Sequence, residues 1–490
     1  MSHSQHQYAS EVLADFARLG VSLTGLTTDS RQLKPGMAFA AYPGTAGDGR
    51  DYIGAAIAAG AAAVLWDAAD FSWVPAWGKV PNLAVRDLKS RVGSIAAQIY
   101  GNPGRDLWTI GVTGTNGKTS CTQWMAQGLN SLSRKTAVMG TLGNGFLPDL
   151  IYTGNTTTDA ALLQATLAGY RDAGATAVVM EVSSHGLAQG RVTGVEFDVA
   201  VLTNLSRDHL DYHGDMASYA AAKARLFDWP ELRYAVLNLD DAFGRELAAK
   251  RPVNTAQVVG YGFEQGEVRG SELQLSPAGL VLQVTTPWGQ AELHSSLLGR
   301  FNAHNLLACL ATLLVSEVTL ADAIHVLSAI APVAGRMQAL GGDGAPWVVI
   351  DYAHSPDALE KVLLTLREIH LAGKVWCVFG CGGERDVGKR PLMGAIASRW
   401  ADQVMVTSDN PRSEDPLAII AAVRAGMNGN EMVEANRAQA IAEVVARAQV
   451  GDVVLIAGKG HEDYQEIAGV KYPFSDLQAA QQSLEIRLCA

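Results

Sequence analysis

The stretch Gly111-Val112-Thr113-Gly114-Thr115-Asn116-Gly117-Lys118-Thr119-Ser120 decides the fold of the central part of the chain. It follows an apolar run at 107–112, typical of a buried strand, and a helical pattern begins at about Lys118. In this setting glycines let backbone N–H groups wrap phosphate oxygens, Lys118 can reach the outer phosphates and Thr119 can bind Mg²⁺. Val112 stands where the strict phosphate-loop pattern has glycine. An ordinary glycine-rich turn is the alternative, but the spacing favours a site for ATP.

Further apolar runs alternate with helical patterns after this loop. Apart from Asp198, the runs 177–180, 198–202 and 234–237 are continuously apolar, which indicates strands of a parallel sheet covered on both faces. Residues 257–298 instead alternate between apolar and polar, as β-strands do. The sequence Pro-Trp-Gly at 287–289 predicts a hairpin turn. We therefore expect an antiparallel extension of the central sheet over 257–298.

A glycine- and proline-rich cluster and a second βα series divide the chain. The cluster at 100–104 ends a first set of short strands, among them 37–41 and 62–66. The second series starts near Pro346, and 490 residues allow about three domains. We therefore predict an α/β protein with an N-terminal α/β domain over 1–102, a central phosphate-loop domain over 103–332 and a C-terminal Rossmann-like domain over 333–490. The strands of the second series are expected at 347–350, 375–379, 403–406 and 453–456.

The composition narrows the classes of partner. Lys and Arg number 38 and Asp and Glu 49, a net charge of −11, whereas nucleic-acid binding needs clustered positive charge. The N-terminal residues 1–7 lack the pattern of a signal peptide, and the longest apolar run, 52–66, is shorter than the ~20 residues of a spanning helix. The five cysteines are scattered and odd in number. We expect a cytoplasmic protein without a nucleic-acid or membrane partner.

The sequence Gly-Thr-Asn-Gly-Lys-Thr at 114–119 resembles the Mur ligase superfamily, whose members join an amino acid or peptide to a carboxylate with ATP and which includes folylpolyglutamate synthases. The resemblance extends over nearly the whole chain. It implies that a third-domain arginine, Arg336, meets the phosphates and that Asp351 meets the ribose. Domain closure over such a site would exclude water. The implied ATP-binding residues are Gly114, Thr115, Asn116, Gly117, Lys118, Thr119, Ser120, Asn305, Arg336 and Asp351.

Two residues after apolar strands suggest a second magnesium site beside the phosphate loop. Glu181 and His209 follow the strands at 177–180 and 198–202, although Glu181 could instead cap a helix and His209 could be a loop histidine with its partners satisfied. Lys223 by itself has the pattern of an exposed helical lysine. The resemblance implies instead that Lys223 is carbamylated and helps to hold Mg²⁺. The implied catalytic residues are Lys118, Glu181, His209 and Lys223, and the implied metal ligands are Thr119, Glu181, His209 and carbamylated Lys223.

Polar segments in the first two domains resemble the family's elements for a UDP-muramoyl-dipeptide acceptor. Hydroxyls and amides can bind pyrophosphate and peptide groups, and Arg191 can pair with an anion, although each Ser or Thr could also cap a turn. The stretch 44–47 is expected to face the nucleotide. The implied acceptor-binding residues are Thr28, Ser30, Asn155, Thr156, Thr157, Ser183, Gln189 and Arg191.

Asp409-Asn410-Pro411-Arg412 follows the strand at 403–406. Asx-Pro is a turn, and the planar fork of Arg412 suits a carboxylate, with a surface ion pair as the alternative. The segment resembles the signature of Mur ligases that add meso-diaminopimelate, which is lysine with an extra carboxylate. Lysine would leave the arginine unpaired, so a desolvated site would reject it. The implied diaminopimelate-binding residues are Arg385, Asp409, Asn410, Pro411, Arg412, Gly458 and Glu462.

The resemblance thus implies an ADP-forming ligase, expected to be a monomer, with ATP and Mg²⁺ as cofactors. It would add meso-diaminopimelate to the D-Glu γ-carboxylate of UDP-N-acetylmuramoyl-L-Ala-D-Glu through an acyl phosphate, a step of peptidoglycan precursor synthesis. Another Mur ligase or a folylpolyglutamate synthase is the nearest alternative, against which 409–412 and the first ~100 residues speak. A phosphate-loop regulatory ATPase, or a nucleotide-binding scaffold without turnover, is the alternative of a different class.

Overall fold

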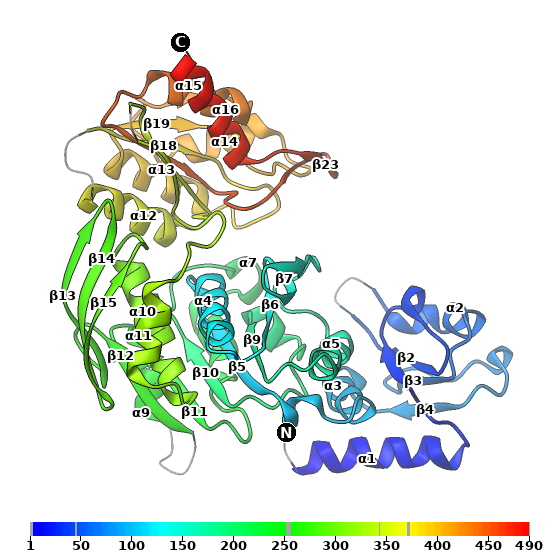
Figure 1. Cartoon of the computed structure of the whole chain (residues 1–490). Coiled ribbons are helices and arrows are strands. Elements are labelled where there is room, and N and C mark those ends of the chain that lie inside the picture. Colours follow the sequence, from blue (N-terminus) through cyan, green and yellow to red (C-terminus); the bar gives the residue numbers. More distant parts are fainter. Residues whose placement is uncertain (1–2, 45–46, 251–255, 343, 370–372, 490) are drawn as a thin grey trace.

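The computed structural model describes residues 3–44, 47–250, 256–342, 344–369 and 373–489. Thr45 and Ala46, within the stretch expected to face a nucleotide, lie outside the described residues. Three large sheets follow one another along the chain (Figure 1). The α/β class predicted from the sequence is confirmed.

The first sheet has four parallel strands in the order β1-β2-β3-β4. Its strands are β1 (Gly25–Thr27), β2 (Met37–Ala41), β3 (Ala63–Asp67) and β4 (Asn82–Val85). Its helices are α1 (His3–Arg18), α2 (Ile53–Ala58) and α3 (Leu88–Ile99). Apolar residues of α1 and α3 pack in one core and those of α2 in another, which covers both faces of the sheet.

Helix α3 of the first part packs against the central part so closely that their backbones are in contact at Gly93 and Gly194. A Cβ on Gly93 of α3 would lie 2.0 Å from the carbonyl oxygen of Thr193, and one on Gly194 would lie 2.5 Å from that of Gly93. Ala160 and Ala161, from the central part, belong to the same apolar core as α1 and α3. The two parts are therefore held by backbone and apolar contacts.

The central sheet has eleven strands in the order β15-β14-β13-β12-β11-β10-β5-β9-β6-β7-β8. Its strands are β5 (Trp108–Thr113), β6 (Thr136–Gly140), β7 (Gly143–Phe146), β8 (Asp149–Ile151), β9 (Ala177–Glu181), β10 (Val199–Leu202), β11 (Tyr234–Asn238), β12 (Gln257–Gly262), β13 (Val268–Ser276), β14 (Gly279–Thr286) and β15 (Gly289–Ser295). Its helices are α4 (Lys118–Ser131), α5 (Ala160–Asp172), α6 (Ser184–Ala188), α7 (Leu210–His213), α8 (Met216–Ala224), α9 (Ala242–Lys250), α10 (Arg300–Val315) and α11 (Leu320–Ser328). One core holds α4, α10 and α11 on one face, and a second holds α5, α6 and α9 on the other.

The antiparallel extension is shorter than the sequence pattern predicts. Strand β12 pairs with β11 in parallel, because α9 lies between them and returns the chain along the sheet, and its short contact with β13 is parallel too. The antiparallel part begins with β13 and β14, and the hairpin turn at 287–289 is confirmed. The hairpin of β7 and β8 at the opposite edge was not anticipated, since its glycine-rich sequence has few typical strand residues.

The third sheet has six strands in the order β16-β17-β21-β18-β19-β20, of which only β16 is antiparallel. Its strands are β16 (Gln338–Gly341), β17 (Trp347–Asp351), β18 (Val375–Phe379), β19 (Gln403–Val406), β20 (Met432–Val433) and β21 (Val453–Ala457), and β22 (Tyr464–Ile467) and β23 (Val470–Pro473) form a separate hairpin. Its helices are α12 (Pro356–Ile369), α13 (Lys389–Trp400), α14 (Pro416–Arg424), α15 (Arg437–Arg447) and α16 (Asp476–Cys489). The first three helices and the last two cover opposite faces, a doubly wound arrangement.

A fully buried ion pair lies between α15 and α16. Arg437 Nε and Nη2 each lie 2.7 Å from a carboxylate oxygen of Asp476, and neither side chain is exposed. The same guanidinium donates to the carbonyl oxygens of Ser408 (3.3 Å) and Ala457 (2.9 Å), which follow or end β19 and β21. Arg437 therefore joins the ends of two strands that β18 separates.

Among the described residues, none of the helices has the length and apolar character needed to cross a membrane. The carboxyl ends of the parallel strands in the central and third sheets border the same cavities, and the candidate site lies there.

Replacing Arg437 by methionine should lower the free energy of unfolding by about 3–5 kcal/mol, since it leaves the Asp476 carboxylate buried without its partner. The change is measured by urea unfolding followed through tryptophan fluorescence. Arg447→Met on the same helix is the matched control, because its ion pair with Glu443 is exposed and contributes less than about 1 kcal/mol. Equal stability of the two variants would contradict a stabilising role of the buried pair.

Candidate active site

The phosphate loop lies between β5 and the first residue of α4, as the sequence predicts. Gly114 and Gly117 have positive φ angles of 148° and 87°. A Cβ on Gly114 would lie 1.9 Å from Thr203 Oγ1, and one on Gly117 would lie 2.6 Å from Asn305 Oδ1. The loop thus requires glycine at both positions, and it packs against the end of β10 and against α10.

Two lysine side chains converge on one carbonyl oxygen of this loop. Lys118 Nζ donates to the carbonyl oxygens of Gly114 and Thr115, both at 2.9 Å, and Lys223 Nζ donates to that of Gly114 at 2.8 Å. Burial lowers the pKa of Lys118, and it lowers that of Lys223 well below the usual value with Lys118 as a second cause. Within the described ranges, neither nitrogen has a carboxylate oxygen within 4.0 Å.

The residue pattern alone gave the wrong surroundings for Lys223. Its side chain is not on an exposed helix face, since the residue is only 1% exposed and its ammonium lies 4.4 Å from the centre of the Tyr219 ring. Helix α8 presents the lysine to the loop, and Tyr219 bonds Thr115 at 3.2 Å from the same helix. The position inferred from the family resemblance agrees with this burial.

Glu181 is buried at the end of β9 and faces Thr119. Its carboxylate accepts hydrogen bonds from Thr119 Oγ1 (3.1 Å) and from the backbone N–H and hydroxyl of Thr141 (2.8 and 3.1 Å). Gly140 is required beside it, because a Cβ there would lie 2.4 Å from the carboxylate. Glu181 therefore caps no helix, so that alternative is wrong.

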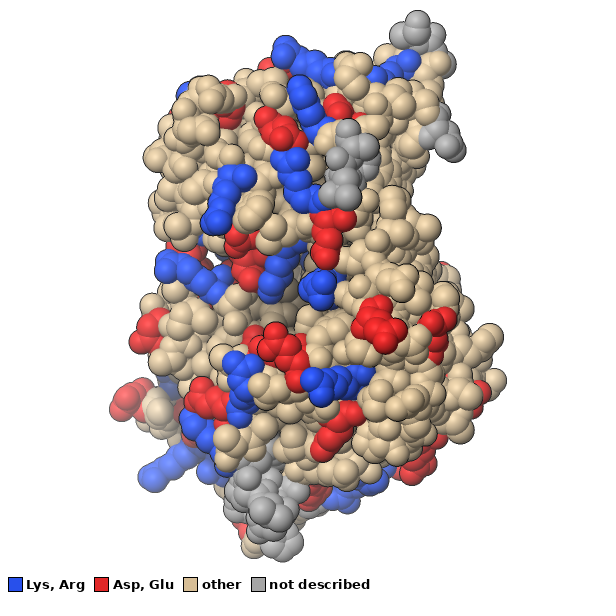
Figure 2. Space-filling view, turned by 90° about the vertical axis from the view of Figure 1, so that its left-hand side faces the viewer, with Lys and Arg blue, Asp and Glu red and all other residues tan. Residues whose placement is uncertain are grey.

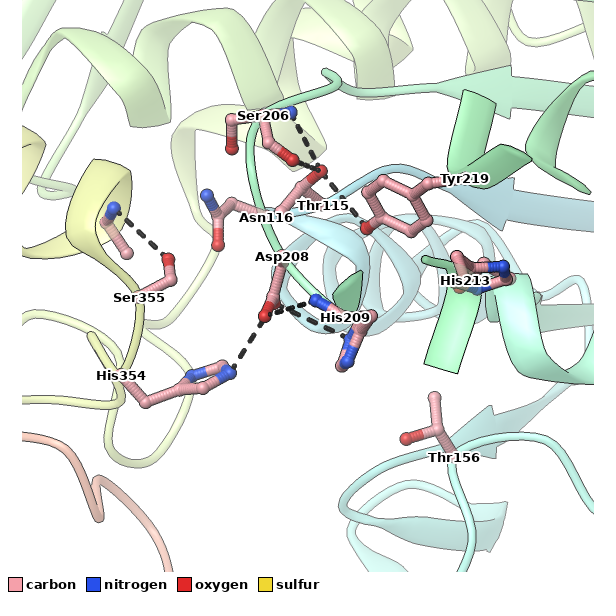
Figure 3. A network of polar contacts seen from close by, with 12 residues as sticks. Thr115, Asn116, Thr156, Ser206, Asp208, His209, His213, Tyr219, His354 and Ser355 are labelled. Carbon is pink, nitrogen blue, oxygen red and sulfur yellow. Dashed lines mark hydrogen bonds and ion pairs between the residues drawn. The ribbon is translucent and has the colours of Figure 1, made fainter. Parts of the chain in front are cut away.

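Asp208 lies between two histidines from different parts of the chain (Figure 3). Its carboxylate is 3.5 Å from His209 Nε2 and 3.8 Å from His354 Nε2, and His354 follows β17 of the third sheet. Burial lowers the pKa of both imidazoles, so both rings are neutral at pH 7. The His209 ring also lies over that of His185, at 5.0 Å between centroids.

The expected catalytic and metal-binding side chains line one cavity of about 360 Å³. Lys118, Thr119, Glu181, His209 and Lys223 all border it. The Thr119 hydroxyl and the Glu181 carboxylate are oxygen donors of the kind that Mg²⁺ prefers. The described residues contain no cluster of three or more His, Cys, Asp or Glu able to hold a metal, so the chain fits Mg²⁺ only when other oxygens complete the shell. Substrate phosphates and water commonly do so.

Most of the expected acceptor-binding residues border the same cavity. These are Asn155, Thr156, Thr157, Ser183 and Arg191. Gln189 borders a neighbouring cavity instead, although its amide oxygen accepts a hydrogen bond from Arg191 Nε at 2.9 Å. The alternative of turn capping holds for Ser183, whose hydroxyl accepts from the N–H of Gly186 in α6. Thr28 and Ser30 lie after β1 of the first sheet and border neither cavity.

A larger cavity of about 720 Å³ opens between the central and third sheets. It is lined by six of the residues expected to bind ATP: Asn116, Gly117, Ser120, Asn305, Arg336 and Asp351. Arg336 Nη2 donates to Thr119 Oγ1 at 3.2 Å, and burial raises the pKa of Asp351. Lysines and arginines alternate with acidic residues on the face drawn in Figure 2, and at this cavity Arg300 pairs with Glu368.

Sequence reasoning missed several residues that join the two sheets here. Asp357 accepts hydrogen bonds from Asn116 Nδ2 (2.9 Å) and Ser206 Oγ (3.0 Å). Asn204 and Asn238 also line the larger cavity. Both come directly after or at the end of apolar strands, the same signal that identified Glu181.

The residues expected to bind diaminopimelate gather on loops at the carboxyl ends of β18, β19 and β21. A Cβ on Gly382 would lie 3.0 Å from Arg412 Nη1 and 3.8 Å from Arg385 Cγ, so both arginines approach the same space beside this glycine. A Cβ on Gly458 would lie 2.6 Å from the Asp409 carboxylate. Of the whole expected set, only Arg385 also borders the phosphate-loop cavity.

Glu462, one of the two acidic members of this set, is held by two neighbours. Glu462 Oε2 accepts hydrogen bonds from Asn410 Nδ2 and Lys459 Nζ, both at 2.8 Å. Lys459 is fully buried and also donates to Asn410 Oδ1 at 3.0 Å. The sequence assigns Lys459 no role, because a lysine between two glycines has no distinguishing pattern of its own.

Models of known families match all three parts of the chain. The Mur ligase family catalytic domain matches residues 22–100, the Mur ligase middle domain matches 112–313, and the Mur ligase glutamate ligase domain matches 335–460. The chain therefore belongs to the Mur ligase family.

Its similar relatives include proteins named UDP-N-acetylmuramoyl-L-alanyl-D-glutamate–2,6-diaminopimelate ligase. That of Chromobacterium violaceum is 56% identical over 470 residues, 95% of each chain. That of Neisseria meningitidis serogroup A is 52% identical over 467 residues, 94% of this chain and 95% of its own. A solved structure of that name is 39% identical, covers 95% of each chain and has a TM-score of 0.69. MurF of Thermotoga maritima in complex with ADP, 19% identical with a TM-score of 0.67, covers 95% of this chain and 97% of its own and shares the fold.

Replacing Gly114 by alanine should weaken ATP binding roughly a hundredfold, because the new Cβ cannot fit beside Thr203 and the loop must move. Calorimetric titration with ATP measures the change. Gly174→Ala is the matched control, since that glycine has a similar need for positive φ (82°) but no atom within 4 Å of the added Cβ. Unchanged ATP affinity in Gly114→Ala would contradict the loop's role.

Proposed function

We propose that this chain uses ATP to add meso-diaminopimelate to the D-Glu γ-carboxylate of UDP-N-acetylmuramoyl-L-Ala-D-Glu, with release of ADP and phosphate. One observation carries the proposal. Arg385 and Arg412 both lie within 4 Å of the position that a Cβ of Gly382 would take, and Arg385 also borders the cavity that contains Lys118. The pair can bind a carboxylate of the incoming amino acid within reach of the phosphate-loop chemistry. The high identity to ligases of that name supports the same substrates.

The reaction needs an activated carboxylate, since a carboxylate ion is a poor electrophile. The γ-carboxylate oxygen attacks the γ-phosphorus of ATP, ADP leaves, and an acyl phosphate results. The amine of diaminopimelate then attacks the acyl carbon, the tetrahedral intermediate expels phosphate, and the amine loses a proton. Lys118 neutralises charge on the transferred phosphoryl group. The neutral His209 and His354 place no further positive charge beside Asp208.

Mg²⁺ would be held by Thr119 and Glu181, together with His209 and carbamylated Lys223, and would neutralise charge on the phosphates. The surroundings of Lys223 support the carbamate. The pKa of Lys223 is lowered well below its usual value, by burial and by Lys118, which favours the neutral amine that can add to CO₂ and release a proton. The product is an anion that can lie beside the Lys118 cation, whereas two ammonium groups repel each other.

The remaining substrate contacts follow from the positions of the side chains. Asn155, Thr156, Thr157, Ser183 and Arg191 would bind the dipeptide end of the acceptor. Thr28 and Ser30 would bind its uridine from the first domain, and Gln189 would orient Arg191. Asp409, Asn410, Pro411, Gly458 and Glu462 would complete the amino-acid pocket.

We also propose that the protein acts as a monomer in the cytoplasm. Cys121, Cys309, Cys377 and Cys381 are buried free thiols, which suits a reducing compartment. The three domains would extend over 1–102, 103–332 and 333–490, each with its own sheet.

The direct test measures phosphate release from ATP and UDP-muramoyl-dipeptide in the presence of meso-diaminopimelate, L-lysine or no amino acid. We expect release to depend on diaminopimelate, and Arg412→Ala to reduce the preference over lysine by roughly a hundredfold, since the second carboxylate loses its partner. Equal release in all three mixtures would overturn the ligase activity. A preference for lysine would overturn only the assignment of Arg412.

Replacing Lys223 by alanine should reduce phosphate release by roughly a hundredfold or more, because the site loses its carbamate. Added short carboxylates, such as acetate, should restore part of the rate. Lys250→Ala is the control, since that lysine is exposed and pairs with Glu246 on α9. Full activity of Lys223→Ala would exclude the carbamate.

A further inference from the structure

The β22–β23 hairpin is hydrogen-bonded to the segment that contains Arg412. The N–H of Arg412 donates to the carbonyl oxygen of Glu466 at 3.0 Å, and the N–H of Ala468 donates to that of Arg412 at 2.7 Å. Arg412 and Ile467 thereby form a parallel bridge outside the third sheet. The hairpin is thus hydrogen-bonded to the backbone of Arg412, the arginine that we assign to the second carboxylate of diaminopimelate.

The same strand also binds the two residues at the start of this segment. Gln465 Nε2 donates to the carbonyl oxygen of Asp409 at 2.7 Å. The N–H of Glu466 donates to Asn410 Oδ1 at 3.0 Å. Arg412 itself has a φ of 53°, a left-handed conformation that residues other than glycine keep only where their surroundings hold them. The hairpin supplies part of those surroundings.

The side chain of Arg412 has two anchors. Its Nη1 donates to the carbonyl oxygen of Gly383 at 2.6 Å, and its Nε lies 3.5 Å from Glu466 Oε2. Both side chains of the ion pair are largely buried, at 18% and 24% exposed. Glu466 is the sole carboxylate within 4.0 Å of this guanidinium among the described residues. Nη1 and Nε of the guanidinium therefore both have neighbours in the protein, which leaves Nη2 to bind a ligand.

We propose that Glu466 is a positioning residue for amino-acid selection, and that the β22–β23 hairpin is the element which presents Arg412 to the second carboxylate of diaminopimelate. This inference rests on the proposed function. An arginine side chain loses much of its rotamer entropy when it binds a carboxylate. If Glu466 already holds the side chain of Arg412 in the folded protein, this entropy is lost on folding and no longer lowers the affinity for diaminopimelate. Glu466 also keeps the guanidinium paired while the pocket is empty. It acts through Arg412 and touches no substrate.

The position of the hairpin fits this role. Burial raises the pKa of Tyr152, and the groups that face it include Tyr464, Lys471, Glu462 and Asp463 of the third part of the chain. Tyr152 lies three residues before Asn155, in the segment expected to bind the acceptor. Tyr464 and Lys471 of the hairpin thus lie near enough to Tyr152 to act on it electrostatically.

The test compares the steady-state kinetics of Glu466→Ala, Glu466→Gln and the unaltered chain for each substrate in turn. We expect Glu466→Ala to raise the KM for diaminopimelate roughly tenfold, while kcat and the KM values for ATP and the acceptor stay within about twofold. Glu466→Gln should show an intermediate KM, because it keeps a polar oxygen beside Arg412 Nε but loses the charge of the ion pair. In an Arg412→Ala background, Glu466→Ala should have no further effect on the KM for diaminopimelate.

The control is Glu443→Ala, which removes a glutamate paired with Arg447 on the exposed face of α15 and should change no kinetic constant. An unchanged KM for diaminopimelate in Glu466→Ala, or an equal rise of all three KM values, would overturn the positioning role. If the unaltered chain shows no diaminopimelate-dependent phosphate release, the proposed function fails and this inference with it. Release by the unaltered chain with no effect of Glu466→Ala overturns only the inference.

Discussion

The approach of two buried lysine amines to the carbonyl oxygen of Gly114 is the interaction on which the site depends. Burial lowers the pKa of both lysines, because an ammonium loses its hydration there, and the neighbouring Lys118 adds to this effect at Lys223. The surrounding fold makes this approach possible, since glycine at 114 lets the loop lie against Thr203 while α8 brings Lys223 to it. The cavity consequently favours negative charge, whether on polyphosphate or on a carbamate.

The junctions on the two sides of the central sheet differ in chemistry. The junction with the first sheet is made by backbone contacts at Gly93 and by apolar residues of α3 and α5. The junction with the third sheet includes polar contacts, such as those of Asn116 with Asp357 and of Arg336 with Thr119. Water can replace polar contacts at little net cost, whereas separating packed apolar surfaces is unfavourable. The polar contacts at the third sheet are therefore the more easily replaced, although Leu298 of the central part also packs in the apolar core of that sheet.

The local sequence was sufficient to predict the part of the site whose residues all lie in one loop. The order of strand, glycine-rich loop and helix predicted the surroundings of Lys118 correctly, because the need for positive φ at Gly114 and Gly117 is a local property. Lys223 shows the limit. Helix α8 is rich in alanine and has no clear apolar stripe, so only the fold reveals that its lysine faces the loop.

The amino-acid pocket shows a second limit. The turn at Asp409–Arg412 could be predicted from its Asx-Pro sequence, but its partner strand β22 comes more than fifty residues later and is short and polar. Pairing between such distant segments leaves no periodic signal in either one. The antiparallel pairing predicted for β12 is wrong for a similar reason. An alternating sequence pattern does not determine whether the neighbouring strand is parallel or antiparallel, and β12 pairs with β11 in parallel.

The close packing at Gly93 and Gly194 has one more consequence. Because even a methyl group does not fit between α3 and the central domain, the first sheet can neither slide nor pivot there without breaking the contact. The separation between the uridine loop proposed at Thr28 and Ser30 and the cavity around Glu181 is then a fixed length. For the acceptor proposed above, the two domains would set the distance between the site of its nucleotide and the site of its reactive carboxylate. Acceptors one residue too short or too long would be rejected by distance alone, even though every chemical group they carry is correct.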